Sequence, residues 1–145
     1  MRPLFVCFLF VATVIRATSL PCLAQKPVYD VTVTADGKSL DLNQGISAST
    51  KTVELTGQLT PESQQQYPQL KPVVLINKAV FNLIRDTRRV GFINWPQDGS
   101  IARLFKEARS GDRFVIQFED VEVQTKQGTT QKVDGLKLIQ ISVKP

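Results

Sequence analysis

The strongest constraint on how this 145-residue chain folds is a period-two alternation of apolar and polar residues that recurs along it. Successive side chains of a β-strand point to opposite faces, so this alternation predicts strands with one buried face. It is clear at residues 28–34 and 52–59. A continuous apolar run predicts a buried strand at 73–76. Further strands are expected at 88–94 and, as a closing hairpin, at 113–143.

Both strands of this hairpin change phase along their length. Apolar residues occupy even positions up to Phe118 and odd positions from Val121 onward. A slip of one residue would turn the following side chains to the other face, so we expect a β-bulge at Glu119–Asp120. The last strand changes phase in the same way between Leu138 and Ile139. Two such changes predict a bent sheet edge or a corner.

One segment, residues 98–110, predicts a helix. Asp98 or Ser100 can cap its beginning, and Gly111 is expected to end it in the left-handed conformation. Its apolar residues recur at helical spacing and form one stripe: Ile101, Leu104, Phe105 and Ala108.

Two other segments leave alternatives open or predict little regular structure. Residues 78–86 suit either a short helix or a strand, because their apolar residues fit both periods. Residues 60–72 hold three prolines and predict a long loop with one helical turn at 61–66. Many short strands with one helix predict a mainly β fold, namely a single β-sandwich over residues 25–145.

The first 24 residues are organised like an export signal. Arg2 precedes an apolar run of twelve residues, Leu4–Ile15, and small residues allow cleavage after Ala24. A bilayer-spanning helix needs about 20 apolar residues, so an uncleaved anchor is the weaker interpretation. We therefore expect a mature chain without a transmembrane segment. We expect it to be exported to the periplasm, with secretion or the cell surface as the alternative.

Residue types that are missing exclude much chemistry. Both cysteines, Cys7 and Cys22, lie in the predicted signal, and the chain has no histidine. A Cys/His zinc site and a Ser-His-Asp or Cys-His nucleophile are therefore excluded from the mature chain. Beyond the signal, 16 Lys and Arg face 13 Asp and Glu, an excess too mild to predict nucleic-acid binding. We expect no enzymatic activity, no metal and no cofactor.

The order of features from residue 98 onward resembles a known family. The helix ends in Ser110-Gly111-Asp112-Arg113, and the next strand contains Phe118-Glu119-Asp120-Val121. The terminal strand ends in Leu138-Ile139-Gln140-Ile141-Ser142-Val143. These motifs resemble the C-terminal immunoglobulin-like domain of GldM, the periplasmic arm of the gliding-motility and type IX secretion machinery. The resemblance covers roughly the last 50 to 70 residues.

Members of that family begin with a transmembrane helix and carry several domains, whereas this chain has a cleavable-looking signal and room for one domain. The resemblance implies a stand-alone periplasmic sandwich that works by protein–protein contact and has no catalytic residues. We also expect the apolar last strand to lie at a sheet edge. There it is either paired in a homodimer, as strand exchange in GldM-like arms suggests, or offered to a partner strand.

Five residues are candidates for binding a partner. Arg85, Arg88 and Arg89 suit an anion or an acidic partner, because guanidinium groups bind carboxylates bidentately. The alternative is a charged turn between two strands. Trp95 is a candidate anchor for a partner or a sugar, with a core position as the alternative. Tyr67 is a candidate because it lies in the predicted long loop.

The acidic residues Glu119, Asp120 and Glu122 invite two catalytic or metal-binding interpretations. They suit Ca²⁺ binding or a carboxylate pair for glycoside hydrolysis. No calcium-loop pattern occurs in the sequence, so we interpret them as the solvated face of a bulged edge strand.

Two functions follow from these observations. The leading hypothesis is a non-enzymatic periplasmic β-sandwich that contacts another envelope protein or a second copy of itself, as part of an envelope or secretion-related assembly. The alternative is a carbohydrate- or small-molecule-binding module built on Trp95 and Tyr67.

Overall fold

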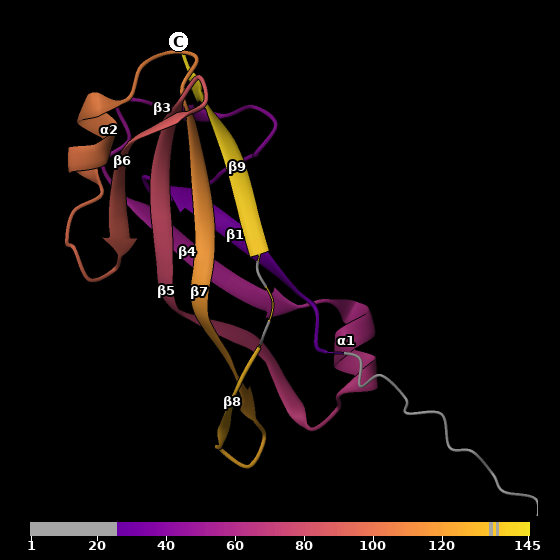
Figure 1. Cartoon of the computed structure of the whole chain (residues 1–145). Coiled ribbons are helices and arrows are strands. Elements are labelled where there is room, and N and C mark those ends of the chain that lie inside the picture. The colour runs from indigo at the N-terminus through magenta and orange to yellow at the C-terminus, as the bar shows by residue number, and fades with distance from the viewer. Residues whose placement is uncertain (1–25, 134, 136) are drawn as a thin grey trace, which may run out of the picture.

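The computed structural model describes residues 26–133, 135 and 137–145, and the predicted signal at residues 1–24 lies outside them. Figure 1 shows a mainly β molecule with two short helices at its periphery. The helices are α1 (Pro61–Gln66) and α2 (Ala102–Glu107). Within the described residues, neither has the length and apolar content needed to cross a membrane. The strands are β1 (Tyr29–Ala35), β2 (Lys38–Ser39), β3 (Ile46–Ser47), β4 (Val53–Leu59), β5 (Leu70–Arg85), β6 (Arg88–Trp95), β7 (Arg113–Thr125), β8 (Thr130–Lys132) and β9 (Lys137–Lys144).

The strands form one mixed sheet in the order β2-β1-β4-β5-β7-β9-β3. In addition, β6 pairs with the second half of β5, and β8 pairs with the end of β7. The sheet curls into a half-barrel, in which β1 and β4 cross behind β5, β7 and β9 (Figure 1). The predicted mainly β class is confirmed. A two-sheet immunoglobulin-like sandwich is not confirmed, because continuous pairing joins the strands into one curled sheet.

The long strand β5 replaces the separate pieces predicted at 73–76 and 78–86. Its first half pairs with β4, and its second half, Ala79–Arg85, pairs with β6. The segment left open between helix and strand is therefore a strand, because two neighbours supply its backbone hydrogen bonds. The loop predicted at 60–72 is shorter than expected, since β5 already begins at Leu70.

The bulge predicted near Glu119 is confirmed in the pairing of β7 with β5. Asp120 pairs with Lys78, and the next pair along β7 involves Phe118, so Glu119 has no partner residue. Both Phe118 and Val121 are consequently buried on the same face. The extra residue thus explains the phase change in the sequence.

The last strand, β9, contains no bulge. Leu138 is 54% exposed while Ile139 is buried, and burial then alternates without interruption. The change of phase in the sequence arises because Leu138 is an apolar residue on the outer side of the sheet. Leu136 lies outside the described residues. The expected edge position of β9 holds for most of the strand, because within the described residues 137–142 pair with β7 alone and β3 pairs only with Val143 and Lys144.

The predicted helical turn at residues 61–66 is confirmed as α1. Thr60 caps it, since its Oγ1 accepts a hydrogen bond from the Ser63 N–H at 3.3 Å. The buried Ser63 hydroxyl accepts a hydrogen bond from the Val28 N–H at 2.8 Å, which ties α1 to the chain that enters β1.

The second helix, α2, is shorter than the helix predicted at residues 98–110. Leu104 and Phe105 are buried as expected. Asp98 does not cap the helix, because its Oδ2 accepts a hydrogen bond from the Asn94 N–H at 2.9 Å and closes the turn after β6.

The end of α2 also differs from the prediction. Ala108 is already extended, with φ −70° and ψ 140°, so the helix ends at Glu107. Gly111 has the expected positive φ of 90°, but it lies in the turn that leads to β7. In that turn the Arg109 N–H donates to Asp112 Oδ2 at 2.9 Å, so a side chain satisfies it instead of a further helical turn.

The hydrophobic core fills the inside of the curl and is closed on one side by α2. The rings of Phe105 and Phe114 pack there with centroids 4.5 Å apart. β4 crosses β5 at Gly57, where a Cβ would lie 2.9 Å from Val74 Cβ, so the close approach requires glycine. The largest fully buried side chains are Phe81, Phe114, Leu59, Leu83, Ile93, Ile116, Ile141, Val33 and Val123.

Candidate binding surface

Arg85, the first of the predicted partner-binding residues, is engaged within the molecule. Its Nε donates to Asp112 Oδ1 at 2.9 Å and its Nη2 donates to Asp112 Oδ2 at 2.7 Å. Asp112 is only 3% exposed, and the hydrogen bond from Arg85 lowers its pKa and raises the pKa of Arg85. This bidentate pair joins the end of β5 to the turn before β7. Arg85 therefore serves the fold.

The other two predicted arginines lie at the surface. Arg88 is exposed, pairs in register with Arg85, and has no ion pair within the described residues. Arg89 Nη1 donates to Asn82 Oδ1 at 3.3 Å, and the guanidinium carbon lies 4.9 Å from the centroid of the Phe92 ring. This cation–π geometry holds the Arg89 side chain over the sheet. The three arginines are thus near one another, but with separate environments.

Trp95 and Tyr67 are not brought together. Both are partly buried and pack against the core. Trp95 pairs with Ala79 in β5, whereas the Tyr67 carbonyl oxygen accepts a hydrogen bond from Leu70, where that strand begins. The nine residue-to-residue steps from Leu70 to Ala79 span about 30 Å of extended strand. The two aromatic side chains therefore do not form one sugar-binding platform.

The acidic residues near the bulge each face a lysine. Glu119 lies 2.6 Å from Lys78 Nζ, and Asp120 lies 3.6 Å from Lys132 Nζ. Glu122 pairs in register with Lys132. These partly exposed ion pairs contribute little to stability. The arrangement fits the interpretation of this segment as a solvated face, but the predicted edge position is wrong, because β7 lies between β5 and β9 and also pairs with β8.

The outer side of the sheet holds a feature that the sequence reasoning missed. Eight uncharged residues occupy directly paired positions of β6, β5, β7 and β9, so their side chains point to the same side. We call these eight residues the outer face. One row is Phe92, Asn82, Val115 and Gln140, and the other is Asn94, Val80, Gln117 and Leu138.

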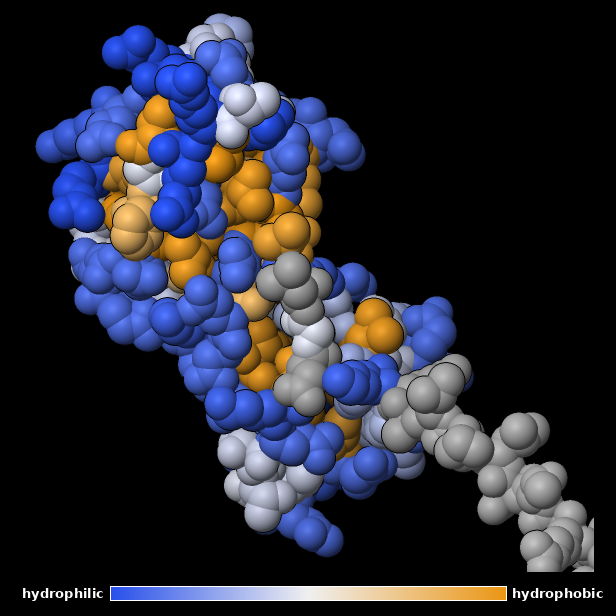
Figure 2. All heavy atoms as spheres, in the orientation of Figure 1, coloured by the Kyte–Doolittle hydropathy of each residue, from blue (hydrophilic) through white to orange (hydrophobic). Residues whose placement is uncertain are grey.

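The outer face is separate from the hydrophobic core. Phe92 is 48% exposed, and the better-covered Val80 does not belong to the core cluster. Figure 2, which views this side of the sheet, shows apolar residues reaching the surface over β5, β7 and β9, bordered by hydrophilic ones. The sequence signal for the outer face was an apolar residue at a position where the alternation of its strand calls for a polar one, as at Leu138.

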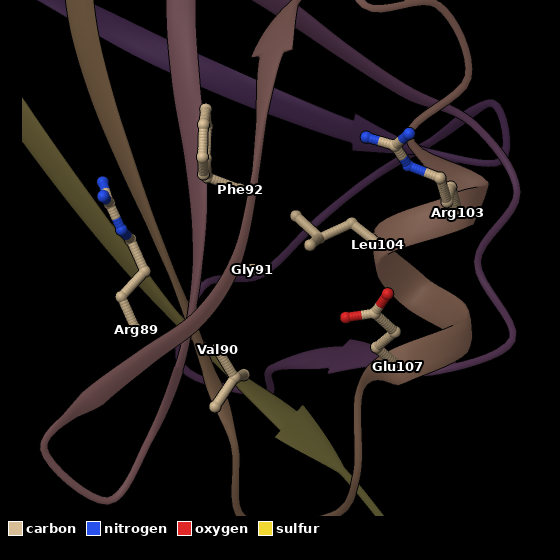
Figure 3. Close-up of a pocket in the computed structure, with 7 residues that line it drawn as sticks. All are labelled: Arg89, Val90, Gly91, Phe92, Arg103, Leu104 and Glu107. Carbon is tan, nitrogen blue, oxygen red and sulfur yellow. The ribbon is translucent and has the colours of Figure 1, made fainter.

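A groove of about 540 Å³ lies beside the outer face, between β6 and α2. Figure 3 shows Leu104 projecting from α2 toward Gly91, with Arg103 and Glu107 on either side of it along the helix. A Cβ on residue 91 would lie 2.8 Å from Leu104 Cδ1, so glycine allows the helix to approach. The remaining lining residues are Arg89, Val90 and Phe92.

Positive charge is concentrated in the segment of the chain that contains β6 and α2, the two elements that border this groove. All six arginines of residues 26–145 lie between residues 85 and 113. That segment holds seven Lys and Arg against four Asp and Glu, whereas the rest of 26–145 holds nine of each. The entire excess therefore lies in the segment that runs from the end of β5 through β6 and α2 to the start of β7. The sequence reasoning missed Arg103, which the uneven distribution of arginine would have identified.

Comparison with profiles of known protein families, with curated proteins and with solved structures finds no match for this chain. The likeness to GldM therefore rests on the short sequence motifs alone.

Proposed function

We propose that this chain is a non-enzymatic exported β-domain that binds another protein through the outer face. The observation that carries the proposal is the composition of that face: four apolar and four amide side chains in adjoining rows, with no charged residue among them. Centres of protein–protein interfaces are depleted of charged residues in the same way.

The dimensions of the outer face fit the centre of an interface. Four strands about 4.8 Å apart, with two rows about 7 Å apart, cover about 260 Å². One partner in a standard interface buries about 800 Å², so the outer face needs a surrounding rim. Arg89 over Phe92, and Arg113 in the adjoining row beside Ile84, supply a positively charged part of that rim. The partner is therefore a protein with an apolar patch bordered by acidic side chains.

The cellular setting of the proposal comes from the sequence. The predicted signal and the GldM-like motifs support a periplasmic domain in an envelope or secretion-related assembly. An immunoglobulin-like architecture belongs to the same proposal. Its support is that β1 and β4 lie behind β5, β7 and β9 as a second layer would (Figure 1).

The test compares two serine variants of exposed apolar residues. Leu138→Ser alters the outer face. Val73→Ser alters a residue near the start of β5, outside that face, and Val73 is 59% exposed where Leu138 is 54% exposed. Each protein is used for affinity capture from envelope extracts under mild crosslinking, and the recovered partner is then purified for titration. We expect Leu138→Ser to weaken binding about tenfold and Val73→Ser to leave it unchanged. Equal binding by both variants, or no defined partner with the wild type, refutes the proposal.

A further inference from the structure

The free edge of β6 faces the groove. The Asn94 N–H donates to Asp98 Oδ2 at 2.9 Å, and the Asn94 carbonyl oxygen accepts from the Asp98 N–H at 2.9 Å. Both backbone groups of Asn94 therefore point away from β5. In an antiparallel strand this direction alternates with each residue, so the N–H and C=O of Phe92 point the same way.

These Phe92 groups have no partner within the described residues. β6 pairs with β5 alone in the sheet, and no backbone hydrogen bond beyond that pairing reaches Phe92. Val90 is skipped in the register between Gly91 and Arg89, which leaves it beside the same edge, 41% exposed. An exposed strand edge of this kind is a template for a further strand.

The groove beside this edge suits an extended chain of acidic character. Its volume of about 540 Å³ lies in the range of ligand-binding clefts. Leu104 lies at the floor of the groove but is only 3% exposed, so the exposed Val90 supplies the accessible apolar surface. The exposed Arg103 provides a guanidinium at one end, as Figure 3 shows. Glu107 borders the other end and repels acidic side chains there. The net charge of the surrounding segment 85–113 favours a partner of opposite sign.

We propose that an extended acidic peptide segment binds between β6 and α2 and adds a strand to the sheet at Phe92. The inference rests on the proposed function and deepens it. It assigns a chemical class to the segment of the partner that extends from the outer face into the groove. The peptide backbone pairs with the N–H and C=O of Phe92. A carboxylate of the peptide binds Arg103 bidentately, and alternate side chains of the peptide pack against the exposed Val90.

The experiment uses the matched variants Phe92→Ala and Phe92→Pro. Both remove the aromatic ring, but only proline removes the N–H that points into the groove. Proline is tolerated on an edge strand where the N–H faces away from its neighbour. Random linear peptides displayed on phage are selected on wild type and on Phe92→Ala, and enriched peptides are synthesised for fluorescence anisotropy with each variant. Far-UV circular dichroism and Trp95 fluorescence check that each variant folds.

We expect enriched peptides to alternate apolar residues with an acidic residue at one preferred position. They should bind Phe92→Pro about tenfold more weakly than Phe92→Ala, because a hydrogen bond is lost. Arg103→Glu should remove the acidic preference. If Phe92→Pro does not fold, peptides with alternate amides N-methylated replace it. In an added strand only every second amide of the peptide faces β6. Methylating that set of alternate amides should therefore weaken binding, and methylating the other set should not.

Several outcomes overturn the inference. In the selection, the inference fails if peptides are enriched no more on wild type than on Arg103→Glu, or if the enriched peptides lack acidic residues. In the binding measurements, it fails if the peptides bind Phe92→Ala and Phe92→Pro equally, or if methylating either set of alternate amides has the same effect. Light scattering that shows a wild-type dimer lost in Phe92→Pro would assign the edge to a second copy instead. Because Leu138→Ser does not alter the groove, failure of peptide selection is distinguishable from failure of the outer-face proposal.

Discussion

Replacing Gly57 by alanine tests the crossing that gives the sheet its curl. Gly57 of β4 pairs with Val74 of β5, in one of two residue pairs that join these strands. An added Cβ would lie 2.9 Å from Val74 Cβ and 3.1 Å from the Val74 carbonyl oxygen. Neither atom can move by a side-chain rotation, so β4 itself has to shift away from β5.

The expected cost follows from two opposing terms. Inserting a methyl group into a packed region costs about 1 to 3 kcal/mol. Replacing a strand glycine by alanine recovers about 0.5 to 1 kcal/mol, because alanine loses less backbone entropy on folding. The difference spans about 0 to 2.5 kcal/mol. Because neither Val74 atom can yield, we expect Gly57→Ala to fall in the upper part of that range and to lower the free energy of unfolding by about 1 to 2 kcal/mol.

Gly91→Ala is the matched control. Its added Cβ would meet Leu104 Cδ1 at 2.8 Å, which is the far end of a flexible side chain. The measurement is urea unfolding of the mature chain, followed by far-UV circular dichroism with a constant denaturant slope. The reasoning is refuted if Gly57→Ala is as stable as the wild type, or if it costs no more than Gly91→Ala.

Two further variants test buried polar groups. Arg85 lowers the pKa of Asp112 in the folded protein below the value of about 4 that an aspartate has in the unfolded chain. The charged carboxylate therefore stabilises the fold at pH values above about 4. This contribution is lost as the pH falls toward the lowered pKa of the folded state. Asp112→Asn should therefore lower the thermal midpoint at pH 7 much more than at acidic pH, and an equal loss at both would contradict the pairing. The buried Tyr29 hydroxyl has no hydrogen-bond partner in the described part of the chain, so Tyr29→Phe should raise stability by about 1 kcal/mol in urea unfolding. Burial also raises the Tyr29 pKa, so the advantage of the Phe variant should grow above about pH 10, and a less stable variant would show that the hydroxyl is bonded.

Local patterns were sufficient where one segment carries the whole signal. Alternation predicted β1 and β4 within one or two residues, because the burial of each side chain follows its own position along a strand. The bulge at Glu119 was predictable for the same reason. The helix α2 was predicted too long, since Asp112 satisfies the backbone after Glu107 and only the folded chain brings that carboxylate into place.

The candidate site was predicted in part. The arginine cluster was recognised, but Arg85 binds Asp112, which lies 27 residues further along the chain. Arg103 and Phe92 come from different elements and border one groove only because Gly91 lets α2 approach β6. No local pattern relates these positions.

By itself, the sequence determined the mainly β class, the buried phase of β1 and β4, the place of the bulge in β7, and the lack of histidine and cysteine beyond the predicted signal. Only the tertiary structure decided that residues 78–85 continue β5, that β4 crosses it at Gly57, and that eight uncharged side chains meet on one outer face. The physical reason is that strand partners and register depend on hydrogen bonds and packing between distant segments, whereas the periodicity of a single segment specifies only which of its faces is buried.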